Sequence, residues 1–539
     1  MDRKDTGYSE NSIGAWLLIA LAVYLVRIMP WALAEYWYDE VLTLGEFVLD
    51  PRGKGLWGGV FRTYPIANNH ILSTALYWIW VRVLNFNLGA EQMVRLPSLL
   101  FGAGTIAIVM CHWRKWLGGR IANIGGLLLA ISPVFTAYAY QIRGYSMSIF
   151  LATTALSGAL ELVHGKSKSG FALTCASCLL LPLVIPSNIL FLPVLCLALF
   201  LSSDNLRERL KMAVPPCVCG LLGICYYFTI WTQFVKAAQE PAGWDSPWLV
   251  AGNLLLAVLA HALVLLALLF VRKAQPAEEP KKEPSPLAFP MPDIHNPLKH
   301  WPLALLLATV AIIGGMLLIS KAGQAPYPRV FLVFLPAVTL AILLVSRKSS
   351  ANTLSFPLVL VLVLVNGLLW EQVSTWLTNR ALAKGVSPSN LLQQYYRGNS
   401  DLREAAMLFY KEQWMENSLL LADEYDHPTL SFYWRLFGGH PRGVNSFNTI
   451  PKGFFNEWRG PKPRIWAVAK TPEAAARMFA HAGIASAEEL LKKGSDGSEG
   501  NGMTVVAICG LRAIYVPNIL PTQPIPRPKT RPDLNSKTI

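Results

Sequence analysis

Long apolar segments recur through the first two thirds of this chain, and they restrict its fold more than any other feature. Of its 539 residues, 53% are hydrophobic and 15% are charged, and the mean hydropathy is +0.38. Typical soluble domains carry roughly 25% charged residues. A helix crosses a bilayer with about 20 apolar residues, and it satisfies its own backbone hydrogen bonds there. The composition therefore predicts an α-helical polytopic membrane protein.

A window of bilayer length gives about eleven spanning segments. The first follows Arg3 and Lys4 and has no small-residue cleavage site behind it, so we interpret it as a signal anchor that begins in the cytoplasm. An odd number of spans places everything after Glu371 on the outer face. The expected spans are 13–33, 93–113, 121–139, 147–163, 171–184, 190–201, 214–231, 249–271, 303–319, 330–345 and 354–369.

The apolar stretch 71–86 is assigned differently, because it is short and contains Arg82. If it crossed the membrane, the basic cluster at 114–120 would lie outside, against the positive-inside rule. An amphipathic helix along the outer interface leaves that cluster in the cytoplasm. We therefore predict a first outer loop, 35–92, that holds interfacial helices.

The net charge of +14 fits this topology better than it fits a nucleic-acid partner. Basic residues gather in the short gaps between apolar runs, as expected for cytoplasmic loops. The 8 cysteines show no zinc-type spacing and no disulfide framework, so they do not indicate a redox compartment.

Two regions differ in composition from the membrane module, which we assign to 1–371. Within it, the segment 274–300 is rich in Pro, Glu and Lys and is predicted to be a disordered cytoplasmic loop. The polar region 372–520 is predicted to be an extracytoplasmic α/β domain, followed by a Pro-rich, basic tail at 521–539. Its expected elements are helices at 401–415 and 472–482, strands at 418–422 and 464–469, and a closing hairpin of 503–510 with 513–516.

Polar side chains gather in the first outer loop. Asp39 and Glu40 follow the first span, and Asn68, Asn69 and His70 open the interfacial helix. Ionisable groups near span ends are costly and mark pathways or sites. Two structural alternatives stay open: the acidic pair caps a following helix, and the Asn and His side chains only hold the loop together.

Several short motifs occur in a fixed order along the chain. The motifs are Tyr38-Asp39-Glu40, Asn68-Asn69-His70, Arg95-Leu96-Pro97-Ser98, Ser132-Pro133, Tyr140-Gln141-Ile142-Arg143-Gly144-Tyr145 and Tyr327-Pro328-Arg329. In these motifs and their order, the chain resembles the polytopic GT-C glycosyltransferases that use polyprenyl-phosphate sugars. It most nearly resembles the family 39-like protein O-mannosyltransferases and the aminoarabinose transferases of lipid A.

The resemblance implies inverting transfer of a hexosyl or pentosyl group from a polyprenyl-phosphate donor to an acceptor hydroxyl on a protein, lipid or glycan. It implies action at the extracytoplasmic face of a membrane, such as the bacterial inner membrane, among membrane lipids. Asp39 is then the general base, and Glu40 tunes this neighbour or orients the loop. Arg143, Arg329 and Tyr145 are expected to hold the donor phosphate, although arginines at span ends also snorkel to headgroups. Substrate contacts are expected from Asn68, Asn69, His70, Tyr140 and Gln141.

A bound divalent metal is possible, with His70 as one ligand, because the aminoarabinose enzymes can use this position for a metal. The family often carries an acid at the position of Ser148, and its replacement here weakens the case for a metal. No cofactor is certain.

A transporter or flippase of lipid-linked glycans is the alternative from another class. Such proteins show internal repeats and broken helices near the membrane midplane. The sequence shows neither, and its polar groups crowd one face.

Overall fold

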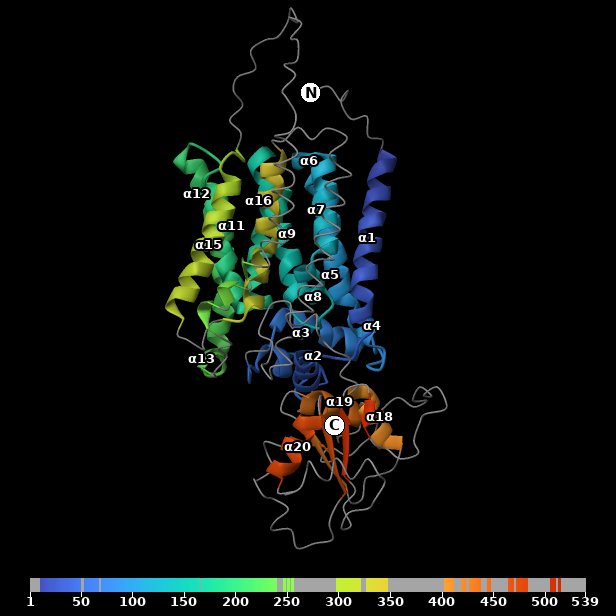
Figure 1. Cartoon of the computed structure of the whole chain (residues 1–539). Coiled ribbons are helices and arrows are strands. Elements are labelled where there is room, and N and C mark those ends of the chain that lie inside the picture. The colour runs from blue at the N-terminus through green and yellow to red at the C-terminus, as the bar shows by residue number, and fades with distance from the viewer. Residues whose placement is uncertain are drawn as a thin grey trace, which may run out of the picture. The chain divides into compact units, whose positions relative to one another are not determined.

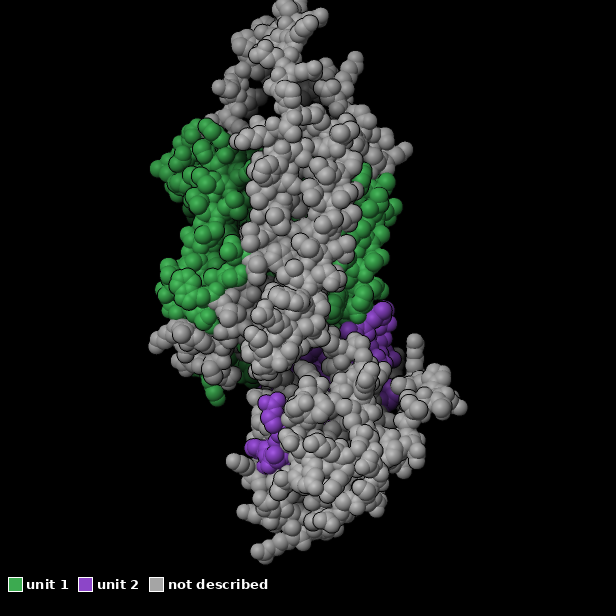
Figure 2. Space-filling view, viewed as in Figure 1, with its two compact units in different colours: residues 1–32, 60–76, 95–396 green, residues 33–59, 77–94, 397–539 purple. Residues whose placement is uncertain are grey.

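The computed structural model describes two groups of residues. The first group is 10–49, 53–66, 69–165, 167–239, 246–248, 250–252, 254–255, 297–320 and 326–347. The second group is 402–411, 418–422, 426–437, 444–446, 464–469, 472–482, 505–509 and 512–514. The chain forms two compact units: unit 1 holds 1–32, 60–76 and 95–396, and unit 2 holds 33–59, 77–94 and 397–539 (Figure 2).

Unit 1 is a bundle of apolar helices (Figure 1). Short π- or 3₁₀-helical segments, labelled η, continue several of them. The elements are α1 (Glu10–Ala32), α5 (Leu96–Ala107), η4 (Ile108–His112), α6 (Arg114–Leu117), α7 (Gly119–Ile131), α8 (Pro133–Ala139), α9 (Tyr145–Gly165), α10 (Lys168–Val184), η5 (Pro186–Leu190), α11 (Phe191–Phe200), α12 (Leu206–Cys225), η6 (Tyr226–Ile230), α13 (Trp231–Gln239), α15 (Trp301–Ile319), η7 (Pro328–Phe334) and α16 (Leu335–Arg347).

Helix α9 is the centre of this bundle. It packs against α5, α10, α16 and η7, and 78% of its apolar window is buried, against 22% for α1 and for α15. The close α9–α10 contact depends on Gly158, where a Cβ atom would lie 2.6 Å from the carbonyl oxygen of Gly170. Small residues of this kind let two membrane helices approach closely. The polar turn that precedes Tyr145 lies at one end of this largely buried helix.

Six helices among the described residues are long and apolar enough to cross a membrane, and a seventh span results if α7 and α8 count as one. The expected spans from 13–33 to 214–231, together with 303–319 and 330–345, each coincide with an apolar helix or helix pair. Most of 249–271 and all of 354–369 lie outside the described residues. The prediction of a multi-pass α-helical membrane protein is confirmed.

The expected span 121–139 is not one straight helix. Helices α7 and α8 meet at an angle of 62°. Ser132 joins them in an extended conformation (φ −60°, ψ 120°), and its Oγ accepts a hydrogen bond from the N–H of Phe135 at 3.3 Å. A residue before proline avoids the helical region, so Pro133 breaks the helix and starts the next one. The expectation that no span is broken was therefore wrong at this position.

The stretch 71–86 forms α3 (Ile71–Trp78) and the π-helical segment η3 (Ile79–Val83). At 1.5 Å per residue these elements are about 20 Å long, which is shorter than the bilayer core of about 30 Å. Its length agrees with the prediction that this segment does not cross the membrane.

Unit 2 contains a five-stranded sheet of order β2-β1-β3-β4-β5. The first four strands are parallel and β5 runs antiparallel to β4, with Leu420 opposite Trp466 and Ala467 opposite Ala507. The elements of the C-terminal part are α18 (Leu402–Lys411), β1 (Ser418–Ala422), α19 (Asp426–Leu436), β2 (Val444–Ser446), β3 (Arg464–Ala469), α20 (Pro472–His481), β4 (Val505–Cys509) and β5 (Arg512–Ile514).

The α/β character of this part is confirmed, as are the two expected strands and the closing hairpin. The three-residue strand β2 was not expected, because so short an edge strand leaves no periodic pattern in a sequence. Unit 2 also contains α2 (Tyr38–Thr43), η1 (Leu44–Val48) and α4 (Glu91–Val94) from the segment 35–92, while η2 (Trp57–Phe61) has residues in both units.

Candidate functional site

The imidazole of His70 is the first element of the candidate site. It is 5% exposed and directly precedes α3. Its Nδ1 accepts a hydrogen bond from the backbone N–H of Gly144 at 2.8 Å. A neutral imidazole has one donor and one acceptor nitrogen. The Gly144 contact therefore places the proton of the neutral ring on Nε2.

Arg143 lies on the opposite side of that ring. Its Nη2 is 3.3 Å from Nε2 of His70, and the side chain is 2% exposed. A guanidinium only donates hydrogen bonds. Two N–H donors therefore converge at this point.

Two arginines act on the charge state of His70. Burial, together with the cations of Arg143 and Arg329, holds the pKa of His70 well below its usual value of 6.5. The ring is therefore neutral at neutral pH. Arg329 lies at the start of η7, and its guanidinium carbon is 4.5 Å from the centre of the Tyr327 ring.

Aromatic rings pack around the two donors. The Tyr145 ring lies edge-on to His70, with centroids 5.3 Å apart, and Arg143 is 5.9 Å from its centroid. Tyr138 packs edge-on against Tyr145 at 5.2 Å. The structure thus brings together His70, Arg143 and Tyr145. The positive charge of Arg329 acts on His70, whose pKa it lowers.

The turn that carries Arg143 is braced from several helices. Ser98 on α5 donates to the carbonyl oxygen of Gln141 at 2.6 Å. Ser148 donates to the carbonyl oxygen of Gly144 at 2.8 Å, and Asn188 in η5 donates to Ser148 Oγ at 2.7 Å. Ser148 therefore has a bracing contact at the position where the family often carries an acid.

Gly144 has no room for a side chain. A Cβ atom there would lie 2.6 Å from Val184 Cγ1 and 3.0 Å from Nδ1 of His70. Real Cβ contacts are longer than this, so the turn and the His70 ring approach this closely only with glycine.

Tyr140 and Gln141 are both fully buried. The Tyr140 ring packs on Arg95, whose guanidinium carbon is 5.3 Å from the ring centroid. Gln141 donates from Nε2 to the carbonyl oxygen of Ala137 at 2.8 Å. Their predicted contacts with substrate stay predictions.

Arg95 has a structural contact that the sequence did not indicate. Its Nη1 donates to the carbonyl oxygens of Trp31 and Ala32, at 3.1 and 2.9 Å. These carbonyls end α1, where a cation compensates the negative end of the helix dipole. The basic residue that opens the Arg95 motif therefore caps the first span.

Asn69 holds the loop before α3. Its Nδ2 donates to the carbonyl oxygens of Val60 and Thr63, at 3.0 and 2.9 Å. Asn69 therefore has the loop-holding contacts of the structural alternative, and its predicted contact with substrate stays a prediction. Its buried Oδ1 has no hydrogen-bond partner within the described part of the chain. Asn68 lies outside the described residues.

Gln233 on α13 fixes the same loop through contacts that the sequence does not indicate. Its Oε1 accepts from the N–H of Tyr64 at 2.7 Å, and its Nε2 donates to the carbonyl oxygen of Arg62 at 3.1 Å. Tyr226 adds a hydrogen bond to the carbonyl oxygen of Phe61. A single glutamine carries no motif, so only the fold reveals this contact.

Asp39 and Glu40 belong to unit 2, where they lie in the first turn of α2 and are 4% and 0% exposed. Glu40 accepts from the N–H of Trp37 at 2.8 Å, and so caps the helix. The capping alternative is therefore confirmed for Glu40. The predicted catalytic roles of Asp39 and Glu40 stay predictions.

The surroundings of His70 do not fit a metal ion. Its Nδ1 is occupied by an N–H donor, and its Nε2 faces a guanidinium that would repel a cation. Across the residues that the structure describes, no group of three or more His, Cys, Asp and Glu side chains could hold a metal. We therefore derive no chemistry from a metal at His70.

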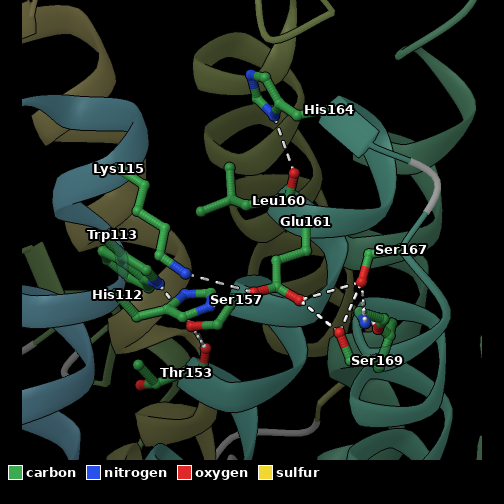
Figure 3. A network of polar contacts seen from close by, with 12 residues as sticks. His112, Trp113, Lys115, Thr153, Ser157, Leu160, Glu161, His164, Ser167 and Ser169 are labelled. Atoms are coloured by element: carbon green, nitrogen blue, oxygen red, sulfur yellow. Dashed lines mark hydrogen bonds and ion pairs between the residues drawn. The ribbon is translucent and has the colours of Figure 1, made fainter. Parts of the chain in front are cut away.

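A second polar cluster surrounds Glu161 (Figure 3). Glu161 accepts from His112 Nε2 at 2.7 Å and from Ser169 Oγ at 3.1 Å, and Lys115 Nζ is 3.8 Å away. Since α9 rises about 1.5 Å per residue, Glu161 lies more than about 20 Å from the Tyr145 end of the helix. This cluster joins η4, α6, α9 and α10 at the end of the bundle away from Arg143.

No protein-family model and no curated protein sequence matches the chain. Among solved structures, ArnT from Cupriavidus metallidurans bound to undecaprenyl phosphate is similar at a TM-score of 0.50 and 16% identity, over 81% of this chain and 86% of that chain. ArnT, an aminoarabinose transferase, is a GT-C glycosyltransferase. This chain has the GT-C fold.

Two further solved structures are similar to this chain at lower TM-scores. Apo ArnT from the same organism aligns at a TM-score of 0.49 and 15% identity, over 92% of each chain. The Archaeoglobus fulgidus oligosaccharyltransferase in complex with Zn and sulfate aligns at 0.39 and 12% identity, over 82% of this chain and 65% of that one. The GT-C fold expected from the motifs is confirmed by the first of these three structures.

Proposed function

We propose that this protein is an integral-membrane glycosyltransferase that transfers a sugar from a polyprenyl-phosphate donor to an acceptor hydroxyl at the extracytoplasmic face. One observation carries the proposal. Nη2 of Arg143 and Nε2 of His70 lie 3.3 Å apart in a buried site, where Arg143 and Arg329 both act on His70 as cations. A phosphate oxygen is an acceptor suited to a guanidinium N–H and an imidazole N–H together.

The fold supports a lipid-linked anion over a soluble one. The converging donors stand at the end of α9, within a bundle whose helices are long and apolar enough to cross a membrane. A polyprenyl chain is soluble only in the bilayer, while its phosphate lies near the interface. In this proposal Arg143, Arg329, His70 and Tyr145 hold the phosphate, and the similar ArnT structure was solved with undecaprenyl phosphate.

The proposed transfer is a single displacement with inversion. Asp39 takes the proton from the acceptor hydroxyl, whose oxygen forms a bond to C1 of the sugar. The bond between C1 and the phosphate oxygen breaks, and its electron pair leaves with the polyprenyl phosphate. Arginine N–H groups stabilise the charge that develops on this leaving group. Glu40 orients the start of α2 through its hydrogen bond to Trp37.

Substrate contacts complete the proposal. The buried Oδ1 of Asn69 is an acceptor suited to a sugar hydroxyl. Asn68, Tyr140 and Gln141 are proposed to line the same region. The acceptor class, whether protein, lipid or glycan, stays open.

The bent pair α7–α8 favours a second candidate, because broken helices are common in transporters. A transporter or flippase of lipid-linked glycans would move its substrate without cleaving it. In proteoliposomes with a labelled polyprenyl-phosphate sugar, transfer without net lipid movement supports the enzyme, and movement without transfer supports the transporter.

The donor site is tested by lipid binding. Purified protein in nanodiscs is titrated with undecaprenyl phosphate, comparing Arg143→Gln with Arg207→Gln, an exposed arginine in α12. We expect affinity to fall at least about tenfold for Arg143→Gln only, since a charge-assisted hydrogen bond contributes about 1.5–3 kcal/mol. Equal affinities for both variants would remove Arg143 from the phosphate site.

The base is tested by transfer activity at equal protein levels. We expect Asp39→Asn to abolish transfer and to leave lipid binding intact, whereas the exposed Asp204→Asn control keeps both. Undiminished transfer by Asp39→Asn would exclude Asp39 as the general base.

A further inference from the structure

Glu91 anchors a buried polar network inside unit 2. Its carboxylate is 2% exposed and accepts from Arg403 Nη1 at 3.0 and 3.2 Å. The hydroxyl of Tyr433 donates to the same carboxylate at 3.0 Å. Glu91 lies in α4 of the first outer loop, Arg403 in α18 and Tyr433 in α19. One carboxylate therefore joins the outer loop to two helices of the C-terminal part.

The network continues to Tyr36. The hydroxyl of Tyr433 accepts from the backbone N–H of Tyr36 at 2.8 Å, and the two rings stack at 5.9 Å with an interplanar angle of 18°. The hydroxyl of Tyr36 donates to the carbonyl oxygen of Leu88 at 2.7 Å. The Tyr433 hydroxyl thus uses its donor and its acceptor on two separate segments of the first outer loop.

Glu35 makes the reciprocal contact. Its carboxylate accepts from the backbone N–H groups of Leu402 and Arg403, at 3.1 and 2.7 Å. These are the first N–H groups of α18, so a loop side chain caps a helix of the C-terminal part.

All of these contacts bear on the start of α2. The N–H of Tyr36 donates to the hydroxyl of Tyr433, and the N–H of Trp37 donates to Glu40. Helix α2 itself packs against α19. The carboxylate of Asp39 lies in the turn that follows. A displacement of Tyr433 therefore changes the position of the helix that carries Asp39.

A buried ion pair gives little net stability, because desolvation offsets most of the attraction. It does penalise alternative arrangements, since removing one partner leaves the other buried and unpaired. The Glu91–Arg403 pair is therefore suited to fixing one geometry of the loop.

We infer that Tyr433, Glu91 and Arg403 are positioning residues for Asp39, so that the C-terminal part of the chain sets the geometry of the proton-accepting carboxylate. This inference rests on the proposed function. It gives the C-terminal part of the chain a role in the chemical step.

The first test separates kcat from KM in full-length protein in nanodiscs. We expect Tyr433→Phe and Arg403→Gln to lower kcat at least about tenfold, while KM for the donor changes less than about twofold. Arg435→Gln is the matched control for Arg403→Gln, because Arg435 is exposed on α19. Unchanged kcat in both variants, or a loss confined to donor KM, would overturn the inference.

The ion pair itself is tested by a double variant. Arg403→Gln removes the cationic partner of the buried Glu91 carboxylate, whereas the combined variant removes both charges and leaves two neutral amides. We therefore expect the combined variant to have a higher kcat than Arg403→Gln alone. Additive losses would show that the two side chains act separately and would count against the network.

A second measurement does not depend on transfer activity. Hydrogen exchange of the segment 38–48 is compared in wild type, Tyr433→Phe and Arg435→Gln. We expect exchange at least about fivefold faster in Tyr433→Phe only, because the start of α2 loses its anchor. Unchanged exchange overturns the inference whatever the activity. Faster exchange in a protein whose wild type transfers no sugar would instead indicate that the proposed function is wrong while the anchoring is correct.

Discussion

The guanidinium of Arg143 and the imidazole of His70 face each other across 3.3 Å, and both present N–H groups at this contact. The N–H of Gly144 makes this arrangement, because it occupies Nδ1 and leaves the ring proton on Nε2. Two hydrogen-bond donors that face each other do not form a hydrogen bond with each other. An anion that accepts from both forms a charge-assisted hydrogen bond with Arg143 and a second hydrogen bond with His70, and we therefore propose that the donor phosphate binds here.

The geometry of the guanidinium gives a prediction for Arg143→Lys. Lysine keeps the positive charge but loses the planar fork that matches a phosphate. We expect undecaprenyl phosphate to bind about tenfold more weakly, which corresponds to about 1.4 kcal/mol. Arg207→Lys is the matched control, because Arg207 is exposed. Tight binding by Arg143→Lys would mean that only the charge matters.

The depressed pKa of His70 predicts a pH dependence of stability. Burial and the two arginines favour the neutral ring in the folded protein, whereas the unfolded chain takes up a proton at about 6.5. The unfolded state then binds more protons below this pH. The contribution of His70 to the free energy of unfolding is therefore complete above about pH 6.5 and is lost as the pH drops below it. Each pH unit in this window costs up to about 1.4 kcal/mol.

This prediction is checked by thermal unfolding in nanodiscs between pH 7.5 and 5.5. His70→Asn removes the titrating ring and keeps a side-chain acceptor for Gly144, so we expect its Tm to depend less on pH than that of wild type. His300→Asn, at an exposed histidine, should keep the wild-type slope. Parallel slopes for wild type and His70→Asn would contradict the prediction.

The close packing at Gly144 gives a third prediction. In Gly144→Ala the new Cβ would overlap Val184 and press on His70, so the turn must move. We expect a loss of about 1–3 kcal/mol in stability, together with weaker binding of undecaprenyl phosphate. Gly315→Ala in α15 meets no atom within 4 Å and is expected to be neutral or slightly stabilising. A Gly144→Ala protein with wild-type Tm and binding would show that the turn has room to adapt.

We expect the Glu161 cluster to contribute to the free energy of unfolding and not to kcat. Glu161→Gln weakens the contacts to His112 and Lys115, and we expect it to lower the free energy of unfolding by about 1 kcal/mol. Because the cluster lies at the other end of α9 from Arg143, kcat per folded molecule should stay at the wild-type value. Glu208→Gln, which breaks an exposed pair with Lys211 at 2.9 Å, should change stability by less than about 0.5 kcal/mol. A fall in kcat for Glu161→Gln would contradict this separation.

The sequence alone determined the helical membrane fold and its order of spans. Long apolar runs leave few choices, because a backbone in lipid must satisfy its hydrogen bonds within the segment. It also singled out His70 and Arg143, since rare polar residues near span ends stand out against an apolar background. The break at Ser132 was missed although Pro133 is visible, because proline also occurs inside continuous helices of this chain, as at Pro182 in α10.

Only the tertiary structure decided what these polar groups contact. Gln233 binds a loop 171 residues away in sequence, and Tyr433 binds Tyr36 across 397 residues. A side chain that pairs with a distant backbone group leaves no periodicity and no spacing for a sequence to show. The tautomer of His70 has the same origin, because it depends on a single N–H that the fold delivers from Gly144. Local patterns determine which segments are helices, whereas the orientation of a hydrogen-bond donor depends on packing among segments that are far apart in the chain.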